Sequence, residues 1–318
     1  MASNLKDLVK KNKKYIKEDI NLNELIDKFL LSEQNRKRDR FIPAFHPSLI
    51  SKGIPCQLWW YFFLNNKEAL PEKWKTESLT AMAIGSAIHN EAQHILYRMG
   101  ILEGVYKCLS CEHEFWATSP KECPNCATTF KKWDYVKFKE VPIHIGFIRG
   151  HADGILNQQG KRHLLELKSI KNVDRPNATY GYERLNNKPM DDHFIQTQLY
   201  LDCWHEISKK AALGEEYTID DSGKVSSIKL TSPVYDGART VGAITHGVIE
   251  YLAKNSSEKS SFIVKRNQNS ISFLMDEMKL IWKAYLEDNI DALTGVNSFD
   301  KGKCKNCPYR NECSWQVC

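Results

Sequence analysis

The spacing of four cysteines constrains this chain more than any other feature. Cys108-x2-Cys111-x11-Cys123-x2-Cys126 contains two C-x-x-C pairs separated by 11 residues. Paired thiols at this separation are typical of a zinc ribbon, in which four sulfurs hold one tetrahedral Zn²⁺. We therefore predict a closed, structural zinc site in a small hairpin that needs the metal to fold. A rubredoxin-like iron site is the main alternative.

Basic and aromatic side chains are interleaved in and just after this segment. Such a surface could stack on the bases of single-stranded DNA and neutralise its phosphates. A solvated surface with packed aromatic residues explains the same pattern equally well. The side chains concerned are Lys121, Lys131, Lys132, Trp133, Tyr135 and Lys137.

Composition excludes several classes of protein. The longest apolar run, 58–64, is seven residues, whereas a membrane span needs about 20. The first 20 residues are lysine-rich without an apolar centre, so we expect no secretory signal and a cytoplasmic location, in the host cytoplasm if the protein is viral. In that compartment C-x-x-C pairs favour metal sites over disulfides. The net charge of +6 permits a polyanionic partner without requiring one.

Hydrophobic periodicity and turn residues predict alternating helices and strands. The segment 5–40 reads as a polar helical arm, either a solvated face or a phosphate-contacting one. The apolar run 58–64 reads as buried core. Further along we predict a helix over 78–98, strands over 143–148, 152–156 and 163–170 with a turn at 157–160, a helix over 191–209, a strand over 226–231, and helices over 237–254 and 270–288.

Three charged residues around the predicted turn suggest a catalytic site. Glu166 and Lys168 are two positions apart on one strand and therefore share a face. The hairpin could bring Asp153 beside them. Carboxylate oxygens of this kind suit Mg²⁺ or Mn²⁺, which would polarise a phosphate and lower the pKa of a bound water, while the lysine positions that water. The alternative is an exposed strand with an ion pair, but the strand is otherwise largely apolar.

Two helices could add side chains to the same site. His89 lies on the predicted helix 78–98 as a candidate metal ligand, although a lone helical histidine is more often structural. Gln196 and Tyr200 are four residues apart, hence on one face of the helix 191–209. Cys203 belongs to the neighbouring apolar stripe, and we predict a buried thiol there.

The ordered set of His89, Asp153, Glu166-x-Lys168 and Gln196-x-x-x-Tyr200 resembles the PD-(D/E)XK nucleases of the RecB-like exonuclease branch. The resemblance implies an α/β fold, with a mixed sheet flanked by helices in a restriction-endonuclease-like core. It also implies that His89, Asp153, Glu166 and the backbone carbonyl of Leu167 bind Mg²⁺ or Mn²⁺. Lys168 would then assist the attacking water, and Gln196 and Tyr200 would orient Lys168 or the substrate.

The end of the chain extends the resemblance to the iron–sulfur members of this branch, among them CRISPR-adaptation nucleases, AddB-type nuclease domains and phage exonucleases. The segment Cys304-x2-Cys307-Pro308-x-Arg310-x2-Cys313 is similar to their cysteine-rich tail, and Cys56 occupies the place of their upstream cysteine. A four-iron four-sulfur cluster held by these four residues would join the two ends of the chain, in a structural or a redox role. Alternatively, Cys304, Cys307, Cys313 and Cys318 hold zinc and leave Cys56 free.

The sequence thus predicts a metal-dependent DNA nuclease, and more specifically an exonuclease that acts on DNA ends or single strands. We expect it to act in recombination, repair or replication, as phage nucleases do. Its partners would be DNA and possible recombination or replication proteins. One rival is a non-catalytic zinc-ribbon protein that binds nucleic acid, and another is an iron–sulfur redox protein. The expected parts are an N-terminal arm (1–45), a nuclease core (46–103 and 136–300), a zinc-ribbon insert (104–135) and an iron–sulfur loop (301–318).

Overall fold

The computed structural model of the 318-residue chain describes most of the predicted core. The lysine-rich start and the basic run after Gln34 lie outside the described residues, so the predicted helical arm can be compared only over 22–34. The described residues are 22–34, 41–51, 56–69, 75–131, 133–170, 188–213, 217–219, 225–228, 233–294, 304 and 307–313.

The chain divides into two compact units. The first comprises Met1–Asp39 and Lys73–Ala83 and includes the helix α2 (Leu22–Gln34). The second comprises Arg40–Glu72 and Ile84–Cys318 and contains every predicted site residue. Within the described part of the chain, no helix has both the length and the apolarity that crossing a bilayer requires.

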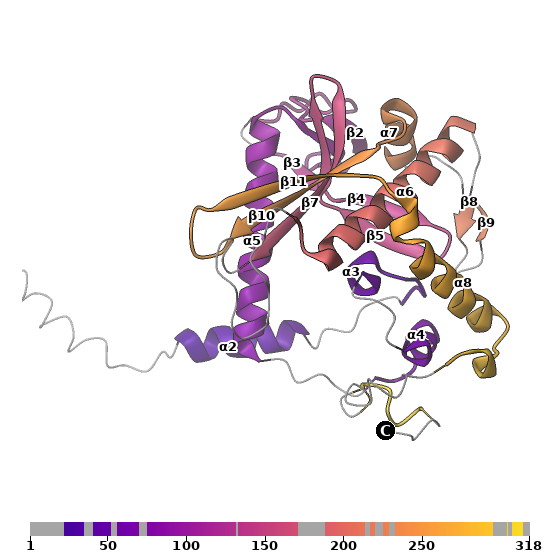
Figure 1. Ribbon diagram of the computed structural model, residues 1–318. Helices are drawn as coiled ribbons and strands as arrows, with labels where there is room; N and C mark the ends of the chain where they lie inside the picture. The colour runs from indigo at the N-terminus through magenta and orange to yellow at the C-terminus, as the bar shows by residue number, and fades with distance from the viewer. Residues whose placement is uncertain are drawn as a thin grey trace, which may run out of the picture. The chain divides into compact units, whose positions relative to one another are not determined.

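A seven-stranded mixed sheet forms the centre of the second unit (Figure 1). Its order is β11-β10-β7-β6-β1-β2, and β3 pairs with the same β1. β7 and β10 are parallel, whereas the other pairs are antiparallel. The bounds are β1 (Leu102–Cys108), β2 (Glu114–Thr118), β3 (Val136–Lys139), β6 (Gly154–Gln158), β7 (Lys161–Ile170), β10 (His246–Ala253) and β11 (Lys259–Lys265).

Two long helices follow the predicted pattern. α5 (Thr76–Arg98) matches the predicted helix 78–98, and α6 (Asp191–Leu213) matches the helix 191–209 with an added turn. α6 begins the connection from β7 to its parallel neighbour β10. Parallel strands need such a long crossover connection. Cys203 on α6 is 3% exposed, which confirms the predicted buried thiol.

Shorter helices complete the apolar core. The predicted core run forms α4 (Gln57–Leu64), with five of its eight residues buried. The predicted helix 270–288 is α8 (Ser272–Leu286). The remaining elements are α3 (Pro47–Ile50), α7 (Pro233–Val241), the strands β4 (Val141–Ile145), β5 (Ile148–Ala152), β8 (Tyr217–Ile219) and β9 (Val225–Ile228), and 3₁₀ turns at Gln268–Ser270 and Ile290–Ala292.

The predicted strand 143–148 is wrong. The chain turns back at Gly146, so the segment forms the antiparallel hairpin β4–β5. Gly146 has φ +54°, a left-handed conformation that glycine adopts without steric cost and that suits a tight turn. This hairpin is a small sheet of its own, and it leads directly to Asp153.

The predicted helix 237–254 is also wrong in its second half. α7 ends at Val241, and β10 begins at His246. β10 lies between β7 and β11, and its residues alternate between buried and half-buried positions. Apolar residues on both faces of an inner strand give no simple alternation in the sequence, so the segment resembles a continuing helix.

The cysteine-bearing segment is joined to the main sheet. β1 pairs with β6 as well as with β2 and β3. Its apolar side chains form a second core cluster that also contains Tyr97 of α5 and Leu165 and Leu167 of β7. The segment therefore shares its core with the rest of the unit.

Candidate active site

Four predicted site residues form one hydrogen-bonded network between β7 and α6. The Glu166 Oε1 atom lies 2.7 Å from the Lys168 Nζ atom. Gln196 connects both residues, because its Nε2 donates to Glu166 Oε1 at 2.8 Å and its Oε1 accepts from Lys168 Nζ at 2.8 Å. The same Nε2 lies 3.3 Å from the Tyr200 hydroxyl. Side chains four residues apart on α6 and two residues apart on β7 thus point to the same place.

Asp153 joins this network from the break between β5 and β6. Its Oδ2 accepts a 2.6 Å hydrogen bond from the Leu167 backbone amide, so the carboxylate is fixed against β7. Its Oδ1 lies 3.5 Å from His89 Nδ1. Gln93, one turn after His89 on α5, donates to the Asp153 carbonyl at 2.9 Å. The predicted hairpin, with its turn after Gln158, therefore does bring Asp153 to Glu166 and Lys168.

Burial makes the Glu166 carboxyl hold its proton unusually strongly. The residue is 3% exposed, and its Oε2 atom is buried without a hydrogen-bond partner. Burial raises the pKa of Glu166 to about 7, with Lys168 acting in the opposite direction and Asp153 raising it further. A buried carboxylate oxygen without a partner is costly, and a bound cation is one of the few groups that would compensate it.

The histidine on α5 is tied electrostatically to the same carboxylates. Burial acts to lower the pKa of His89, but the hydrogen bond and charge of Asp153 outweigh it, and the net pKa is raised. Among the described residues, however, the four ribbon cysteines are the one group of histidine, cysteine and acidic side chains that stands close enough to hold a metal ion, and His89, Asp153 and Glu166 do not form such a group. Side-chain adjustment is therefore needed for one ion to contact all three.

Glu140 is a site residue that the sequence did not reveal. It precedes β4, and the pairing of Val141 with Ala152 puts it beside Asp153. Burial raises the pKa of Glu140, repulsion from Asp153 adds to the increase, and His89 acts to lower it. A correct prediction of the β4–β5 register would have placed this third carboxylate beside Asp153.

Close packing fixes Tyr200 next to the network. A Cβ atom at Gly150 of β5 would lie 2.8 Å from the Tyr200 ring and 3.0 Å from its hydroxyl. Only glycine therefore allows β5 to approach α6 at this point. Tyr200 is 3% exposed, and burial, followed by the charge of Glu166, raises its pKa above the ordinary range, so the phenol stays protonated.

The four ribbon cysteines converge with the geometry of a single metal ion. Their Sγ atoms all lie within 4.8 Å of one another, with 3.7 Å between Cys108 and Cys126 and 3.7 Å between Cys111 and Cys123. Sulfurs at about 2.3 Å from a tetrahedral Zn²⁺ are about 3.8 Å apart, so the residues fit this ion. Hydrogen bonds from Thr128 lower the pKa of Cys126 to about 6, which favours the thiolate that binds metal.

The cysteines predicted to hold an iron–sulfur cluster are less tightly grouped. Cys56, Cys307 and Cys313 pack against the same core cluster. Burial raises the pKa of Cys56, and Cys307 and Cys313 add smaller increases through charge repulsion, so the three thiols are electrostatic neighbours. Cys304 is disulfide-bonded in this structure, so its sulfur is not a free thiolate, and Cys318 lies outside the described residues. The cluster stays a prediction.

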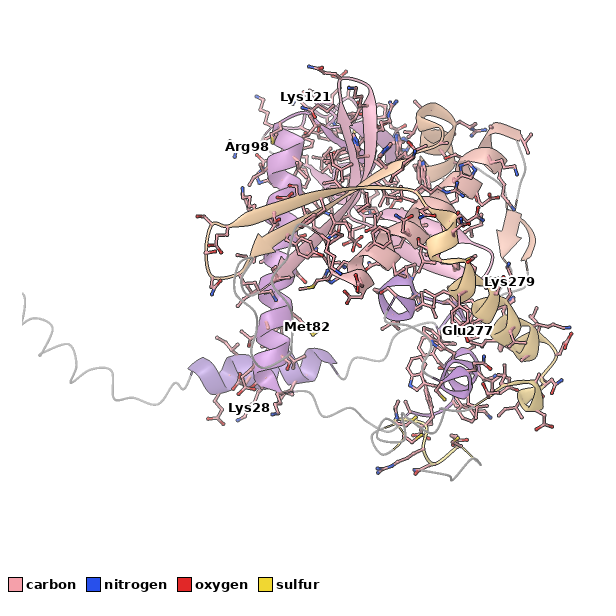
Figure 2. The ribbon with its side chains drawn as sticks, viewed as in Figure 1. Lys28, Met82, Arg98, Lys121, Glu277 and Lys279 are labelled. Carbon is pink, nitrogen blue, oxygen red and sulfur yellow. The ribbon has the colours of Figure 1, made fainter. Side chains whose placement is uncertain are left out.

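The two aromatic residues of the predicted DNA-binding surface, Trp133 and Tyr135, differ in their packing. Trp133 contacts Tyr97 with a ring-centroid distance of 4.6 Å, whereas Tyr135 is 59% exposed. The Lys121 ammonium group lies over the Tyr97 ring, 5.5 Å from its centre, and Figure 2 labels Lys121 together with Arg98, the last residue of α5. Lys132 lies outside the described residues. Tyr135 thus stays available for stacking, while Trp133 is a packing residue.

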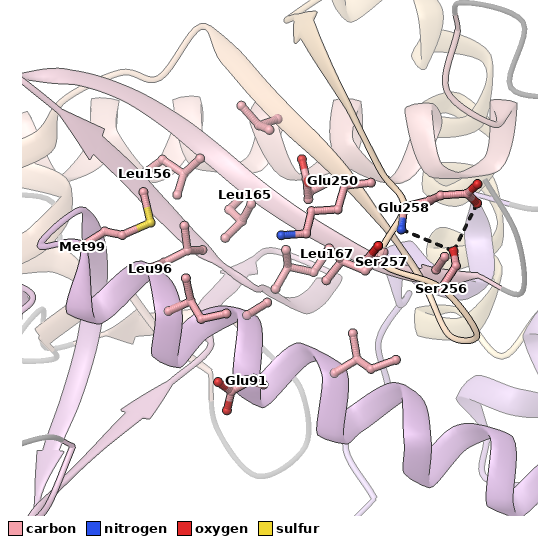
Figure 3. Close-up of a pocket in the computed structure, with 17 residues that line it drawn as sticks. Glu91, Leu96, Met99, Leu156, Leu165, Leu167, Glu250, Ser256, Ser257 and Glu258 are labelled. Atoms are coloured by element: carbon pink, nitrogen blue, oxygen red, sulfur yellow. Dashed lines mark hydrogen bonds between the residues drawn. The ribbon is translucent and has the colours of Figure 1, made fainter. Parts of the chain in front are cut away.

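An apolar groove lies on the other side of β7 from the network. It has a volume of about 430 Å³ and is bounded by α5 and by β6, β7 and β10 (Figure 3). Ile88 and Leu96 of α5 face Leu165 and Leu167 of β7 across it. Leu165 and Leu167 alternate with Glu166 and Lys168 along β7, so the groove and the charged network occupy opposite faces of the strand.

Comparisons with known proteins found no sequence match and two structures of weak similarity. No protein-family model and no curated protein matches the sequence. The crystal structure of SSO0001 aligns with 93% of this chain and 98% of its own, at 11% identity and a TM-score of 0.38. The structure of LHK-Exo in complex with dAMP aligns with 84% of this chain and 96% of its own, at 10% identity and a TM-score of 0.39. TM-scores of this size do not establish a shared fold.

Proposed function

We propose that the protein is a metal-dependent DNA nuclease whose active site is the network around Glu166. The observation that carries the proposal is the buried Glu166 carboxylate, whose Oε2 has no partner, held against Asp153 and Lys168. Two carboxylates and an ammonium group at the meeting point of a strand and two helices cost stability. Such a cost is typical of functional sites rather than of structural ion pairs.

The chain's own residues would supply both binding and positioning. Asp153 and Glu166 would hold Mg²⁺ or Mn²⁺, with His89, Glu140 and the Leu167 carbonyl as further ligands. A divalent cation in such a site supplies charge that activates a water molecule and stabilises a phosphate. Lys168 presents its ammonium group to the same point and would orient the attacking water.

Gln196 and Tyr200 would act as positioning residues. Gln196 holds both Glu166 and Lys168, so it fixes the distance between the carboxylate and the ammonium group. Tyr200 stays protonated and packs against β5, which fixes Gln196 from the other side. Neither residue needs to change its protonation state for this role.

The four ribbon cysteines would hold one structural zinc ion, and Cys56, Cys304, Cys307 and Cys313 a four-iron four-sulfur cluster. The ribbon's sulfur separations fit a single ion. A cubane cluster instead binds each thiolate to a different iron and thereby requires wider spacing. Zinc and iron analysis of the purified protein therefore distinguishes the two assignments, with one zinc and four iron atoms expected per chain.

The test of the function is DNA cleavage by the intact protein and two variants. End-labelled single-stranded, end-labelled double-stranded and circular DNA are incubated with Mg²⁺ or Mn²⁺. We expect Asp153→Ala and Lys168→Ala to lose at least about a hundredfold in rate, the order of one positioned acid–base group. Both variants should keep their zinc and iron.

A matched control separates the site from general charge effects. Lys161 is exposed at the start of β7, seven residues from Lys168 and thus about 23 Å along the strand. Lys161→Ala should cleave at the normal rate. Normal cleavage by Lys168→Ala, or an intact protein inert on all these DNAs with both cations, would reject the proposed function.

A further inference from the structure

A cluster of histidine and arginine side chains lies at one face of the β4–β5 hairpin. Register pairs His144 with Arg149 and Pro142 with His151, and residues of one face alternate along each strand. The rings of His144 and His151 are 5.5 Å apart. His46, from the segment that bridges β5 on its other edge, contacts the Arg149 carbonyl at 3.1 Å through Nδ1. We call His46, His144, Arg149 and His151 the hairpin cluster.

The Arg149 guanidinium is half-buried and lacks a counter-ion. Within the described part of the chain it makes neither an ion pair nor a side-chain hydrogen bond. The nearby Lys139 is already paired with Glu114 at 2.8 Å. Arginine has five donors in a rigid fork, and a half-buried guanidinium with none of them used is rare unless a ligand completes the site.

The pKa shifts in the cluster also indicate a site without a negatively charged neighbour. Burial lowers the pKa of His144 to about 4, and His151, Arg149 and His46 lower it further. Burial also lowers the pKa of Arg149. No carboxylate is among the causes of these two shifts. At neutral pH the cluster therefore offers the permanent positive charge of Arg149 beside an uncharged His144 imidazole.

The arrangement fits an anion better than a metal ion or a packed core. The histidine nitrogens do not form a set with all donor atoms within 4.8 Å, and a guanidinium in their midst would repel a cation. His151 is exposed, so the face is open to solvent. The opposite face of the hairpin carries Ile143 and Ile148 and packs into the core.

The cluster and the candidate active site share one strand. Arg149 and His151 alternate along β5 and project from one face, and Asp153 follows the last residue of β5, Ala152. At about 3.3 Å per residue, His151 lies within about 7 Å and Arg149 within about 13 Å of Asp153, a few nucleotides along a DNA strand. The acidic residues Glu140 and Asp153 thus lie just beyond the open end of the hairpin, whereas Arg149 lies next to its turn.

We propose that the hairpin cluster is a subsite for a backbone phosphate of the DNA substrate, a few nucleotides from the cleaved linkage. Arg149 would contact the phosphate oxygens with two donors, and the histidines would donate further hydrogen bonds. The subsite would hold the strand in register over Asp153. This inference rests on the proposed nuclease function, which it extends to the binding of the strand.

The test is the salt dependence of DNA binding. A short labelled single-stranded DNA is titrated with protein at several salt concentrations, in the Lys168→Ala background so that cleavage does not consume the probe. We expect Arg149→Gln to bind about tenfold more weakly, the order of one charge-assisted contact. The slope of log K against log salt should fall by about 0.7, the value for one phosphate on a single strand.

Two controls make the result specific. Lys161→Ala removes one positive charge at a distance and should change neither affinity nor slope. If Arg149→Gln fails to fold, the second measurement uses the folded parent and DNAs in which one phosphate at a time is an uncharged methylphosphonate. One position should then weaken binding, and His144→Ala should reduce that penalty.

The outcomes separate this inference from the nuclease proposal. Unchanged affinity and slope in Arg149→Gln, or equal losses in Lys161→Ala, would overturn the subsite, as would methylphosphonates without a position effect. Cleavage by the intact protein would then still support a nuclease. Conversely, the intact protein could cleave no DNA while Arg149→Gln still lowers the salt slope of DNA binding. That result would support the phosphate subsite and reject the proposed nuclease function.

Discussion

The stability of Glu166→Gln relative to the intact protein should rise with pH, which is an unusual result for the loss of a buried ion pair. The carboxyl has a pKa of about 7 in the folded protein against an ordinary value of 4.5. Because the folded state holds the proton more tightly, it binds more protons than the unfolded state between these values. Stability should fall as pH rises through this window.

The magnitude follows from the two pKa values. At 1.36 kcal/mol per pH unit, the difference corresponds to about 3 kcal/mol lost between acidic and alkaline pH. The amide introduced by Glu166→Gln does not titrate, so the variant escapes this loss. Contributions that do not depend on pH, such as altered packing around the side chain, cancel when the two pH values are subtracted, and the charge of Lys168 is already included in the pKa of Glu166.

Urea unfolding of the intact protein and of Glu166→Gln measures this difference. Both are compared at about pH 5 and about pH 8, zinc-loaded and without added Mg²⁺ or Mn²⁺. The free energy of unfolding of Glu166→Gln relative to the intact protein should rise by about 2–3 kcal/mol from the lower to the higher pH, because pH 5 already lies above the ordinary pKa of the carboxyl. A fall instead would identify an ordinary ion-paired carboxylate with a lowered pKa, and the reasoning would be refuted.

Two further predictions concern the ribbon and its contact with α7. Cys126→Ser should release the zinc and lower the melting temperature, whereas Cys203→Ser should keep its zinc; equal zinc content in both variants would contradict the ribbon site. Gly237→Ala should destabilise the protein by about 1–3 kcal/mol, because its Cβ would lie 2.1 Å from Trp116. In a Trp116→Leu background the penalty should shrink in thermal unfolding, and a stabilised Gly237→Ala would show that this contact does not exist.

The charged network could be predicted from the sequence because it depends on local periods. Glu166 and Lys168 share a face through the period of two, and Gln196 and Tyr200 share one through the helical turn. The turn after Gln158 supplied the hairpin that brings Asp153 close. Each of these inferences needs only neighbouring residues.

The wrong predictions concern segments whose structure depends on pairing with other parts of the chain. The segment 143–148 alternates like a single strand, and only the pairing across Gly146 shows that it is a hairpin. β10 carries apolar residues at consecutive positions, such as Val248 and Ile249, and its pairing partners β7 and β11 are set by the fold, so its pattern alone does not identify a strand. Glu140 and Arg149 were missed for the same reason, since their neighbours follow from the hairpin register.

The binding of Mn²⁺ tests the central claim most directly. Electron paramagnetic resonance counts free Mn²⁺ during titration of the zinc-loaded protein at neutral pH, beside Glu166→Gln and the distant control Lys161→Ala. We predict at least one bound ion per chain in the intact protein and in Lys161→Ala, and a clear loss in Glu166→Gln. Equal binding by Glu166→Gln and the intact protein would contradict the claim that this carboxylate holds the cation.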